Sequence, residues 1–426
     1  MFKSRKRFFT IVLALGMAAA CLAPCAAAAG PFTITNPYEG VDWGTYEPYR
    51  AELHAHSTVS DGYVDFNLMV EAYYEKGYDV LAMTDHGVVD RGWVDLNVLP
   101  VMRFFQQIDK PSAFFPVSTG LTQQRLQEMS TGVGPGRGGR IMLRVPFGIE
   151  LNPTSLNKSH VNSWFADWGN AYLGGSFEYE VAVRGASGAG GLCAINHPSD
   201  TSGDDNLPLA EAYEGSRVNT VYKLQRLFEK YPGLIGQEIC NAHDRKLWDK
   251  ILTNITPTGR NVFGSGTSDA HKIETIGNRF NWVLMEDNTV ENLREALAAG
   301  AFFAASRGTA GAPEPMITEI TAGAGKIAIE ADNAAAIRWI SDGKEVATGA
   351  EIVLADCAGL GAYVRAEVQG EGGTLYTQPF LLSYEGMPAG KPVPGNYFDW
   401  GGILAFIRQC LLQPAALAYN WLMGLL

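Results

Sequence analysis

The positions of the histidines constrain this chain more than any other feature of its sequence. Six of the seven histidines fall in short motifs that also carry acidic residues, whereas His243 lies outside them. The six are His54, His56, His86, His160, His197 and His271. Imidazole and carboxylate groups together are the usual ligands of zinc, manganese and iron. The pattern therefore predicts a centre with several metal ions, assembled from segments that are far apart in the sequence.

Between about residues 48 and 305, predicted strands alternate with predicted helices. The pattern predicts strands at residues 49–54, 80–83, 141–151, 191–196, 234–240 and 261–266, and helices at 66–76, 221–228 and 293–299. The histidines and acids of the motifs come at or just after the carboxyl ends of strands. Parallel α/β sheets place their active sites at that edge. We therefore expect a (β/α) barrel, with some distortion, that holds the metal centre at one rim.

Residue spacing indicates which of these side chains can share a metal ion. His54 and His56 are two residues apart on a strand, so their side chains lie on one face and can bind one ion. Glu150 ends a strand, where its carboxylate can bridge two ions. Four further candidate ligands are Asp61, His86, Asp269 and His271. Asp269 and His271 repeat the two-residue spacing, and we expect them on the last strand.

Five motifs occur in order within residues 50–305. They are His54-Ala-His-Ser-Thr-Val-Ser-Asp-Gly62, Thr84-Asp-His-Gly87, Gly148-Ile-Glu150, Asn196-His-Pro198 and Ser268-Asp-Ala-His271. Each motif alone is weak, but five in this order are specific. The set resembles the PHP (polymerase and histidinol phosphatase) superfamily. The resemblance implies an α/β protein whose main domain is a distorted (β/α)7 barrel with up to three metal ions.

The resemblance also implies how the ligands divide among two or three divalent ions, which would be manganese, zinc or iron. His54, His56, Glu150 and Asp269 would hold the first ion, Glu150, His160 and His197 the second, and Asp61, His86 and His271 the third. Asp61 stands where some relatives have histidine, and His197 could instead cap a turn. A metal-bound water would be the attacking group, since no protein nucleophile is identified.

Other polar residues have a plainer interpretation beside the functional one. Lys158, His243 and Arg279 could bind the substrate, although solvated charges and a hydrogen-bonded histidine are the ordinary alternatives. Asp85 is expected to be a structural hydrogen-bond acceptor rather than a ligand. His160 lies in a polar stretch, where a surface histidine is the alternative to a ligand.

The C-terminal part of the chain changes character. At residues 312–388, short runs alternate polar with β-branched and aromatic residues, which predicts a small all-β, Ig-like sandwich after a barrel at 45–307. Trp339 and Tyr363 suit its core, and no chemistry is indicated there. This layout looks like a secreted branch of the superfamily that includes carbaryl-hydrolase-like enzymes.

The two ends of the chain carry separate signals. Residues 1–29 combine a basic start, a short apolar run and small residues, which predicts a signal peptide and export to an extracellular, periplasmic or cell-surface location. A membrane anchor and a lipoprotein are the alternatives. The apolar tail at 396–426 is expected to be helical. It could contact a membrane surface, span a membrane or pack against protein.

Charge limits the partners. The formal net charge of −12 becomes −16 without residues 1–29, which carry four basic residues and no acidic one. There is thus no strong case for a nucleic-acid polymer as partner, and a small phosphorylated or ester substrate is expected. The predicted function is that of a metal-dependent phosphoesterase. The alternatives are a carboxylic or carbamate ester hydrolase, whose more apolar pocket could include Trp164, and a non-catalytic exported metal-binding module.

Overall fold

The computed structural model describes residues 32–102, 118–133, 137–152, 159–172, 179–199 and 218–391, with five single positions in the C-terminal tail. The predicted signal peptide at 1–29, Lys158 and nearly all of the predicted tail helix at 396–426 lie outside these residues. No helix within the described ranges is both long and apolar enough to cross a bilayer.

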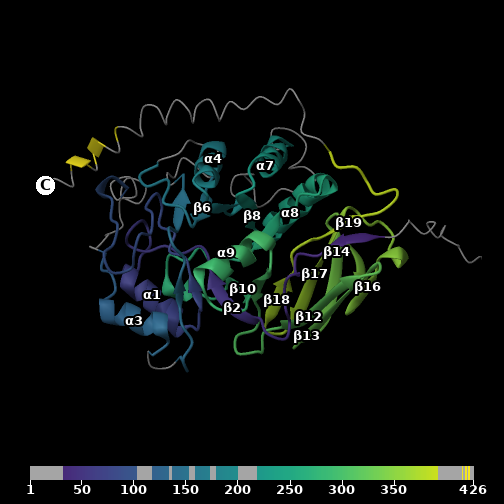
Figure 1. The fold of residues 1–426 in the computed structure, drawn as a ribbon, viewed down its shortest axis with the longest axis horizontal. Coiled ribbons are helices and arrows are strands. Elements are labelled where there is room, and N and C mark those ends of the chain that lie inside the picture. Colours follow the sequence, from purple (N-terminus) through teal and green to yellow (C-terminus); the bar gives the residue numbers. More distant parts are fainter. Residues whose placement is uncertain are drawn as a thin grey trace, which may run out of the picture.

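The chain is a mixed α/β protein with several sheets (Figure 1). Its α-helices include α1 (Phe66–Glu75), α3 (Gln123–Thr131), α4 (Glu180–Gly188), α7 (Val218–Lys230), α8 (Ala242–Ile255) and α9 (Val290–Ala299). Short 3-10 helices are η1 (Thr256–Thr258), η2 (Ile273–Thr275) and η3 (Leu354–Asp356). The predicted helices at 66–76, 221–228 and 293–299 correspond to α1, α7 and α9.

The largest sheet runs from the metal-binding motifs into the C-terminal part of the chain. Its order is β1 (Thr33–Thr35), β19 (Phe380–Ser383), β17 (Tyr363–Gly370), β18 (Gly373–Tyr376), β11 (Phe302–Arg307), β10 (Arg279–Met285), β2 (Glu47–Glu52), β3 (Val80–Leu81) and β4 (Leu143–Arg144). β14 (Ala336–Ser341) also pairs with β17, and β15 (Lys344–Thr348) pairs with β14. Only β2, β3 and β4 are parallel neighbours in it.

Two smaller sheets complete the described structure. One has the order β5 (Ile149–Leu151), β6 (Val161–Trp164), β7 (Leu192–Ile195), β8 (Leu234–Glu238) and β9 (Phe263–Ser265), and the other the order β12 (Met316–Gly323), β13 (Lys326–Asp332) and β16 (Glu351–Val353). β5, β6 and β7 pair antiparallel, whereas β7, β8 and β9 pair parallel. No sheet closes on itself among these residues. Single parallel bridges join Ala55 to Ala270 and His86 to Glu150.

The sequence determines α1 locally. The Asp65 side chain accepts a hydrogen bond from the Phe66 N–H and so satisfies one unpaired donor of the first turn. The buried face of the helix includes Met69 and Tyr73. The chain leaves the helix at Gly77, whose φ of 83° is unfavourable for residues with a Cβ atom. This is the helix that the sequence predicts at 66–76.

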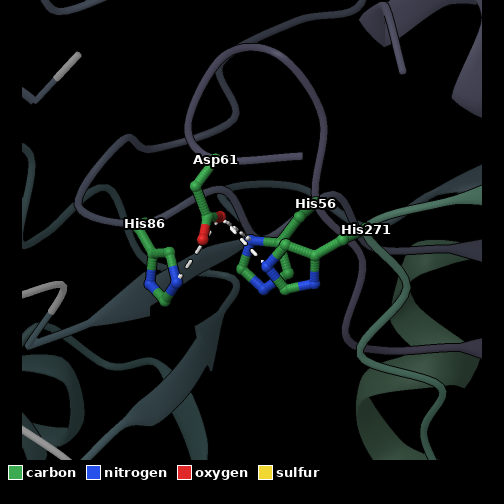
Figure 2. A group of neighbouring side chains, drawn as sticks. All are labelled: His56, Asp61, His86 and His271. Atoms are coloured by element: carbon green, nitrogen blue, oxygen red, sulfur yellow. Dashed lines mark ion pairs between the residues drawn. The ribbon is translucent and has the colours of Figure 1, made fainter. Parts of the chain in front are cut away.

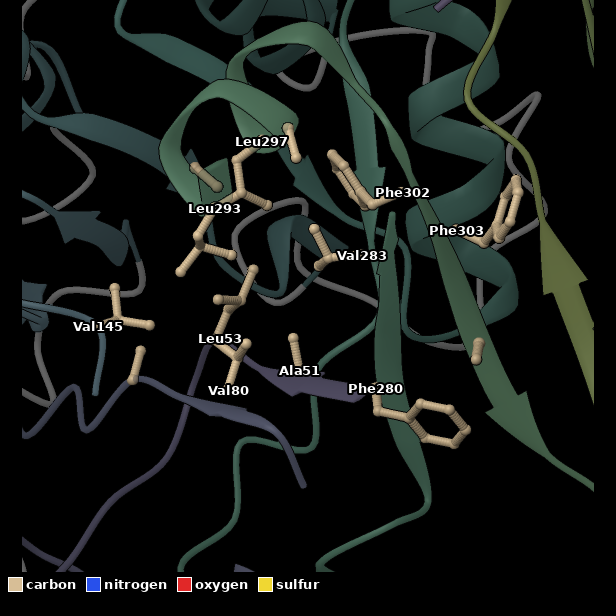
Figure 3. Packing of buried hydrophobic residues seen from close by; sticks show 14 of the residues in the cluster. Ala51, Leu53, Val80, Val145, Phe280, Val283, Leu293, Leu297, Phe302 and Phe303 are labelled. Carbon is tan, nitrogen blue, oxygen red and sulfur yellow. The ribbon is translucent and has the colours of Figure 1, made fainter. Parts of the chain in front are cut away.

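A tightly packed core holds the strand that leads to the first two histidines. Figure 3 shows Leu53, Val80, Val283, Leu297 and Phe302 in one cluster formed by β2, β3, β10, β11 and α9, and each is at most 2% exposed. Burying a side chain of this size stabilises a fold by about 1.5–3 kcal/mol. The core therefore fixes the direction of β2 and with it the position of His54 and His56, which follow this strand.

One predicted strand is wrong. The predicted strand at 141–151 divides into β4 and β5, which belong to different sheets, because the chain turns at Phe147, where φ is 60°. The C-terminal strands, which were predicted to form a sandwich, are joined to the main sheet because β18 pairs with β11. The predicted core residues Trp339 and Tyr363 are both fully buried, but the Tyr363 hydroxyl donates to Asp249 of α8.

Gly148 offers a test of how closely β5 approaches β3. A Cβ atom at this position would collide with the backbone carbonyl oxygen of Met83, in the segment after β3. We expect Gly148→Ala to lower the free energy of unfolding by about 1–3 kcal/mol, as overpacking usually does. Urea denaturation measures this. Gly188→Ala is the matched control because no atom lies within 4 Å of its added Cβ; an equal loss in both variants would contradict the close approach.

Candidate metal centre

The nine predicted metal ligands come together at one place in the structure. His54 and His56 follow β2, His86 follows β3, and Glu150 lies in β5. The segments before β6, after β7 and after β9 contribute His160, His197, Asp269 and His271, and the loop after His56 contributes Asp61. Figure 2 shows four of these side chains from three separate segments. The site is thus built by strand ends that meet at one edge.

The carboxylate of Glu150 lies at the middle of the group and is 1% exposed. Its Oε2 lies 3.2 Å from His54 Nε2, 3.0 Å from His56 Nε2 and 3.1 Å from His86 Nδ1. Its Oε1 lies 3.0 Å from His160 Nδ1 and 3.4 Å from His197 Nε2. One carboxylate therefore contacts five imidazoles, three through Oε2 and two through Oε1.

Four side chains form the first set of converging donor atoms. His54 Nε2 and His56 Nε2 lie 3.0 Å apart, and Asp269 Oδ1 lies 3.3 Å and 3.1 Å from them. Glu150 Oε2 completes the set. The Asp269 side chain is 40% exposed as a whole, although its Oδ1 atom is buried. The first set is therefore reachable from solvent on the side of Asp269.

A second and a third set lie on either side of the first. In the second, Glu150 Oε1 contacts His160 and His197. In the third, Asp61 Oδ1 lies 3.1 Å from His271 Nε2 and 3.7 Å from His86 Nε2 (Figure 2). Three overlapping groups have the separations needed to hold an ion: His56, Asp61, His86 and His271; His54, His56 and Glu150; and His86, Glu150 and His160.

Several ligand atoms are buried close to other ligand atoms but outside hydrogen-bond geometry, which fits a cation between them. These are both ring nitrogens of His160, Nδ1 of His86 and Oδ1 of Asp269. A buried polar atom that lacks a partner costs about 1–3 kcal/mol. Divalent ions would satisfy such atoms together, because each accepts lone pairs from several nitrogens and oxygens at once. The residues present therefore fit divalent metals.

The electrostatics of the group favour positive charge. Burial opposes protonation of His56, but hydrogen bonds and charge–charge attraction from Asp269 and Glu150 raise its pKa to about 10. Burial by itself would raise the pKa of Glu150, but the charges of His54 and His86 outweigh burial and hold this pKa well below its usual value. For His86 burial dominates and lowers its pKa to about 3. The carboxylates thus create a strongly negative local field that attracts cations.

Glu238 hydrogen-bonds the ring of His54 and the backbone of His197, and it was not among the predicted site residues. Its Oε1 lies 2.7 Å from His54 Nδ1 and accepts a hydrogen bond from Thr267 Oγ1 at 2.6 Å. Its Oε2 accepts from the His197 backbone N–H at 2.7 Å. The available signal was an acidic residue at the end of the buried strand β8. A carboxylate behind a metal-binding imidazole fixes its orientation and raises its basicity.

Glu238→Gln tests this orienting role. We expect affinity for Zn²⁺ or Mn²⁺ to fall by about 10–100-fold, since outer-shell partners of metal ligands usually contribute that much. Competition with a chromogenic chelator measures the affinity. Glu291→Gln, at an exposed position in the first turn of α9, is the control. Equal affinities in the two variants would mean that Glu238 has no role in orienting the ligands.

Asp85 is a structural acceptor, as predicted. Its carboxylate accepts hydrogen bonds from the backbone N–H and the hydroxyl of both Ser57 and Ser60. These four bonds fold the loop that carries Asp61 back over the centre.

Asn196, in the middle of the site, donates its amide N–H to Glu150 Oε1 at 2.8 Å, a contact that the sequence did not predict.

The position of Asp269 and His271 corrects a sequence expectation. Both were expected on the last strand, but β9 ends at Ser265 and the two residues lie in the segment beyond it. Asp269 has a φ of 47°, and the Ala270 carbonyl accepts a hydrogen bond from the His56 N–H. Left-handed backbone is costly for a residue with a Cβ atom and is often retained at functional sites. The turn at Asp269, rather than the alternation of side chains along a strand, therefore directs Asp269 and His271 toward the other ligands.

The remaining predicted substrate residues lie outside the group. The His243 ring is in the first turn of α8, where its backbone N–H donates to Asn241. Arg279 begins β10 and lines a separate groove beside the centre. Lys158 lies outside the described residues. Trp164, a candidate wall of an apolar pocket, is 2% exposed and donates its indole N–H to the Leu53 carbonyl.

No family model matches this chain, and no curated protein matches it. Among solved structures it is similar to a two-domain protein of Bacteroides vulgatus that contains a predicted PHP-like metal-dependent phosphoesterase. The identity is 16%, 80% of this chain and 88% of that chain are covered, and the TM-score is 0.40.

Two further structures are similar over parts of their chains. One is PsfC of Pseudomonas syringae, at 13% identity over 56% of this chain and 82% of that chain, with a TM-score of 0.32. The other is a lesion-specific endonuclease of Pyrococcus furiosus, at 13% identity over 59% and 56%, with a TM-score of 0.33. At TM-scores this low, overall similarity carries no argument about function, which rests on the residues of the site.

Proposed function

We propose that this protein is a PHP-type, metal-dependent hydrolase that cleaves phosphoesters at the centre around Glu150. The observation that carries the proposal is the contact of one buried carboxylate with five imidazoles, flanked by Asp61 and Asp269. A structural role alone does not call for so many costly buried groups. Divalent ions bound there would supply an acidified water and neutralise charge on the phosphoryl oxygens.

The protein's own residues would hold, orient and expose the reacting groups. Glu238 keeps His54 in one orientation, and Asn196 does the same for Glu150. The partly exposed Asp269 leaves the first set open to a small substrate. The chain then needs no serine or cysteine nucleophile.

We further propose that the strands around the site form a distorted (β/α)7 barrel. In the ring β2, β3, β5, β6, β7, β8 and β9, ladders supply five of the contacts. The two single bridges, His86–Glu150 and Ala55–Ala270, would supply the others. Both bridges involve residues of the site or their neighbours. In this arrangement, bound metal ions would link the strand ends at the two places where only single bridges join the strands.

A carboxylic or carbamate ester substrate is the second candidate, because the same metals can polarise an acyl group. The burial of Trp164 in the core removes one wall of the apolar pocket that such a substrate would need. The third candidate is a non-catalytic metal-binding module. Export by residues 1–29 and surface contact through the tail at 396–426 belong to the proposal as well.

Parallel assays with three chromogenic substrates separate these candidates. The protein without residues 1–29 is freed of metal and reloaded with Mn²⁺, Zn²⁺ or Fe²⁺, then tested on a phosphomonoester, a phosphodiester and a carboxylic ester. We expect phosphate-ester cleavage that depends on the added metal and is lost in His54→Ala/His56→Ala. Cleavage of the carboxylic ester alone would favour the second candidate. Tight metal binding without any turnover would favour the third.

A further inference from the structure

A groove of about 670 Å³ beside the metal centre is lined by three arginines. Arg245 comes from the first turns of α8, Arg279 from the start of β10 and Arg307 from the end of β11. We call it the arginine groove. Asn241 and Asn278 also line it. None of its described lining residues is Asp or Glu.

The arginine groove borders on two segments of the metal centre. Cys240 lines the groove, and its Sγ lies 3.3 Å from the carbonyl oxygen of Thr267, two residues before Asp269. Asn241 also lines it and donates its amide N–H to the hydroxyl of Ser199, directly after the Asn-His-Pro motif. Two residues of the groove wall therefore contact the segments that carry the metal ligands.

The guanidinium groups of the groove are not neutralised by the described part of the protein. Arg279 and Arg307 form no ion pair with any carboxylate in the described ranges. Arg245 donates to the Ile239 carbonyl, and its guanidinium lies over the Tyr376 ring, 5.1 Å from the ring centre. Elsewhere, by contrast, Arg338 pairs with Glu345. Three like charges along one groove repel one another unless an anion lies between them.

We propose that the arginine groove binds a second phosphate group of the substrate, away from the ester that is cleaved. The inference rests on the proposed phosphoesterase function and narrows its substrate class to small compounds with two phosphates. Guanidinium groups match phosphate oxygens with paired N–H donors, and they stay charged at every physiological pH. A volume of this size accommodates a phosphate together with part of its carrier.

Calorimetry with inorganic pyrophosphate tests the groove without requiring catalysis. The full chain is titrated as purified and after treatment with a chelator, so that phosphate held by metal is separated from phosphate held by arginine. We expect Arg279→Met/Arg307→Met to weaken binding by about 10–100-fold in both states. Arg338→Met should bind like the parent chain. Circular dichroism confirms that each variant is folded.

Two results would overturn the inference: no pyrophosphate binding by the parent chain, or equal binding by the parent and the double variant. Succinate, a dicarboxylate probe, is expected to bind more weakly than pyrophosphate. Equal affinity for both would assign the groove to carboxylates and refute the phosphate assignment.

Kinetics connect the groove to turnover. The ratio of kcat/KM for butane-1,4-diol bisphosphate to that for butyl phosphate should exceed about 10 in the metal-loaded parent chain. It should fall towards 1 in Arg279→Met/Arg307→Met. A ratio that the double variant leaves unchanged would contradict the inference. If neither compound is cleaved, the proposed function fails for these esters, and calorimetry still decides what the groove binds.

Discussion

The Glu150→Gln variant is expected to lose at least about 10³-fold in kcat for a phosphomonoester, because metal-supplied charge stabilisation amounts to several kcal/mol. The change keeps the size of the side chain but removes the charge that five imidazoles share. It also replaces one carboxylate oxygen by an amide NH₂ group, which cannot accept a hydrogen bond from a ring nitrogen or bind a metal ion. Metal content should fall together with activity.

Steady-state kinetics and elemental analysis of the same sample measure both effects. Far-UV circular dichroism verifies the fold, since a lost carboxylate leaves the rings without a partner. Glu291→Gln, in the exposed first turn of α9, is the control and should keep both metal and activity. Near-parental turnover in Glu150→Gln would remove Glu150 from the centre of the mechanism and with it the main support for the proposed site.

The Asp249→Ala variant is expected to lose about 3–5 kcal/mol in the free energy of unfolding, because it leaves a buried guanidinium without its main partner. Arg365 of β17 donates to Asp249 of α8 through Nε at 2.9 Å and Nη2 at 2.8 Å, and both side chains are less than 10% exposed. Glu367 retains one contact with Arg365, which places the loss towards the lower end. Tyr363 also loses the acceptor of its hydroxyl.

Urea denaturation compares this variant with Asp249→Leu/Arg365→Met. Replacing both charges by apolar groups should recover most of the lost stability, since buried ion pairs contribute little net free energy over apolar packing. Arg338→Met, which breaks the exposed pair with Glu345, should cost less than about 1 kcal/mol. If Asp249→Ala were as mild as Arg338→Met, the contact between α8 and the C-terminal strands would not depend on this pair.

The sequence predicted α1 and the convergence of the metal-binding motifs because both depend on short-range patterns. A capping aspartate, an apolar stripe and a terminal glycine lie within about a dozen residues of one another. The spacing of His54 and His56 on a strand is local in the same way. Placing each motif at a strand end then required only the general tendency of α/β sheets to gather their sites at one edge.

The strand pairing was predicted less well. The pairing of β5, β6 and β7 is antiparallel, although a barrel pattern suggested parallel neighbours. The run at 141–151 was predicted as one strand because apolar residues recur along it. The turn at Phe147 arises because the segments on its two sides pair with different sheets. Pairing direction is set by contacts between segments distant in sequence, which a local pattern does not record.

By itself, the sequence determined which side chains could bind metal, because imidazoles and carboxylates at strand ends are recognisable by type and spacing. Only the tertiary structure decided that Glu150 lies between five histidines, that Glu238 orients His54 and that Arg279 faces a groove with Arg245 and Arg307. The physical reason is that burial and partner choice arise when strands from distant parts of the chain pack together. A side chain's neighbours across a sheet or a rim then fix its charge, its orientation and its role.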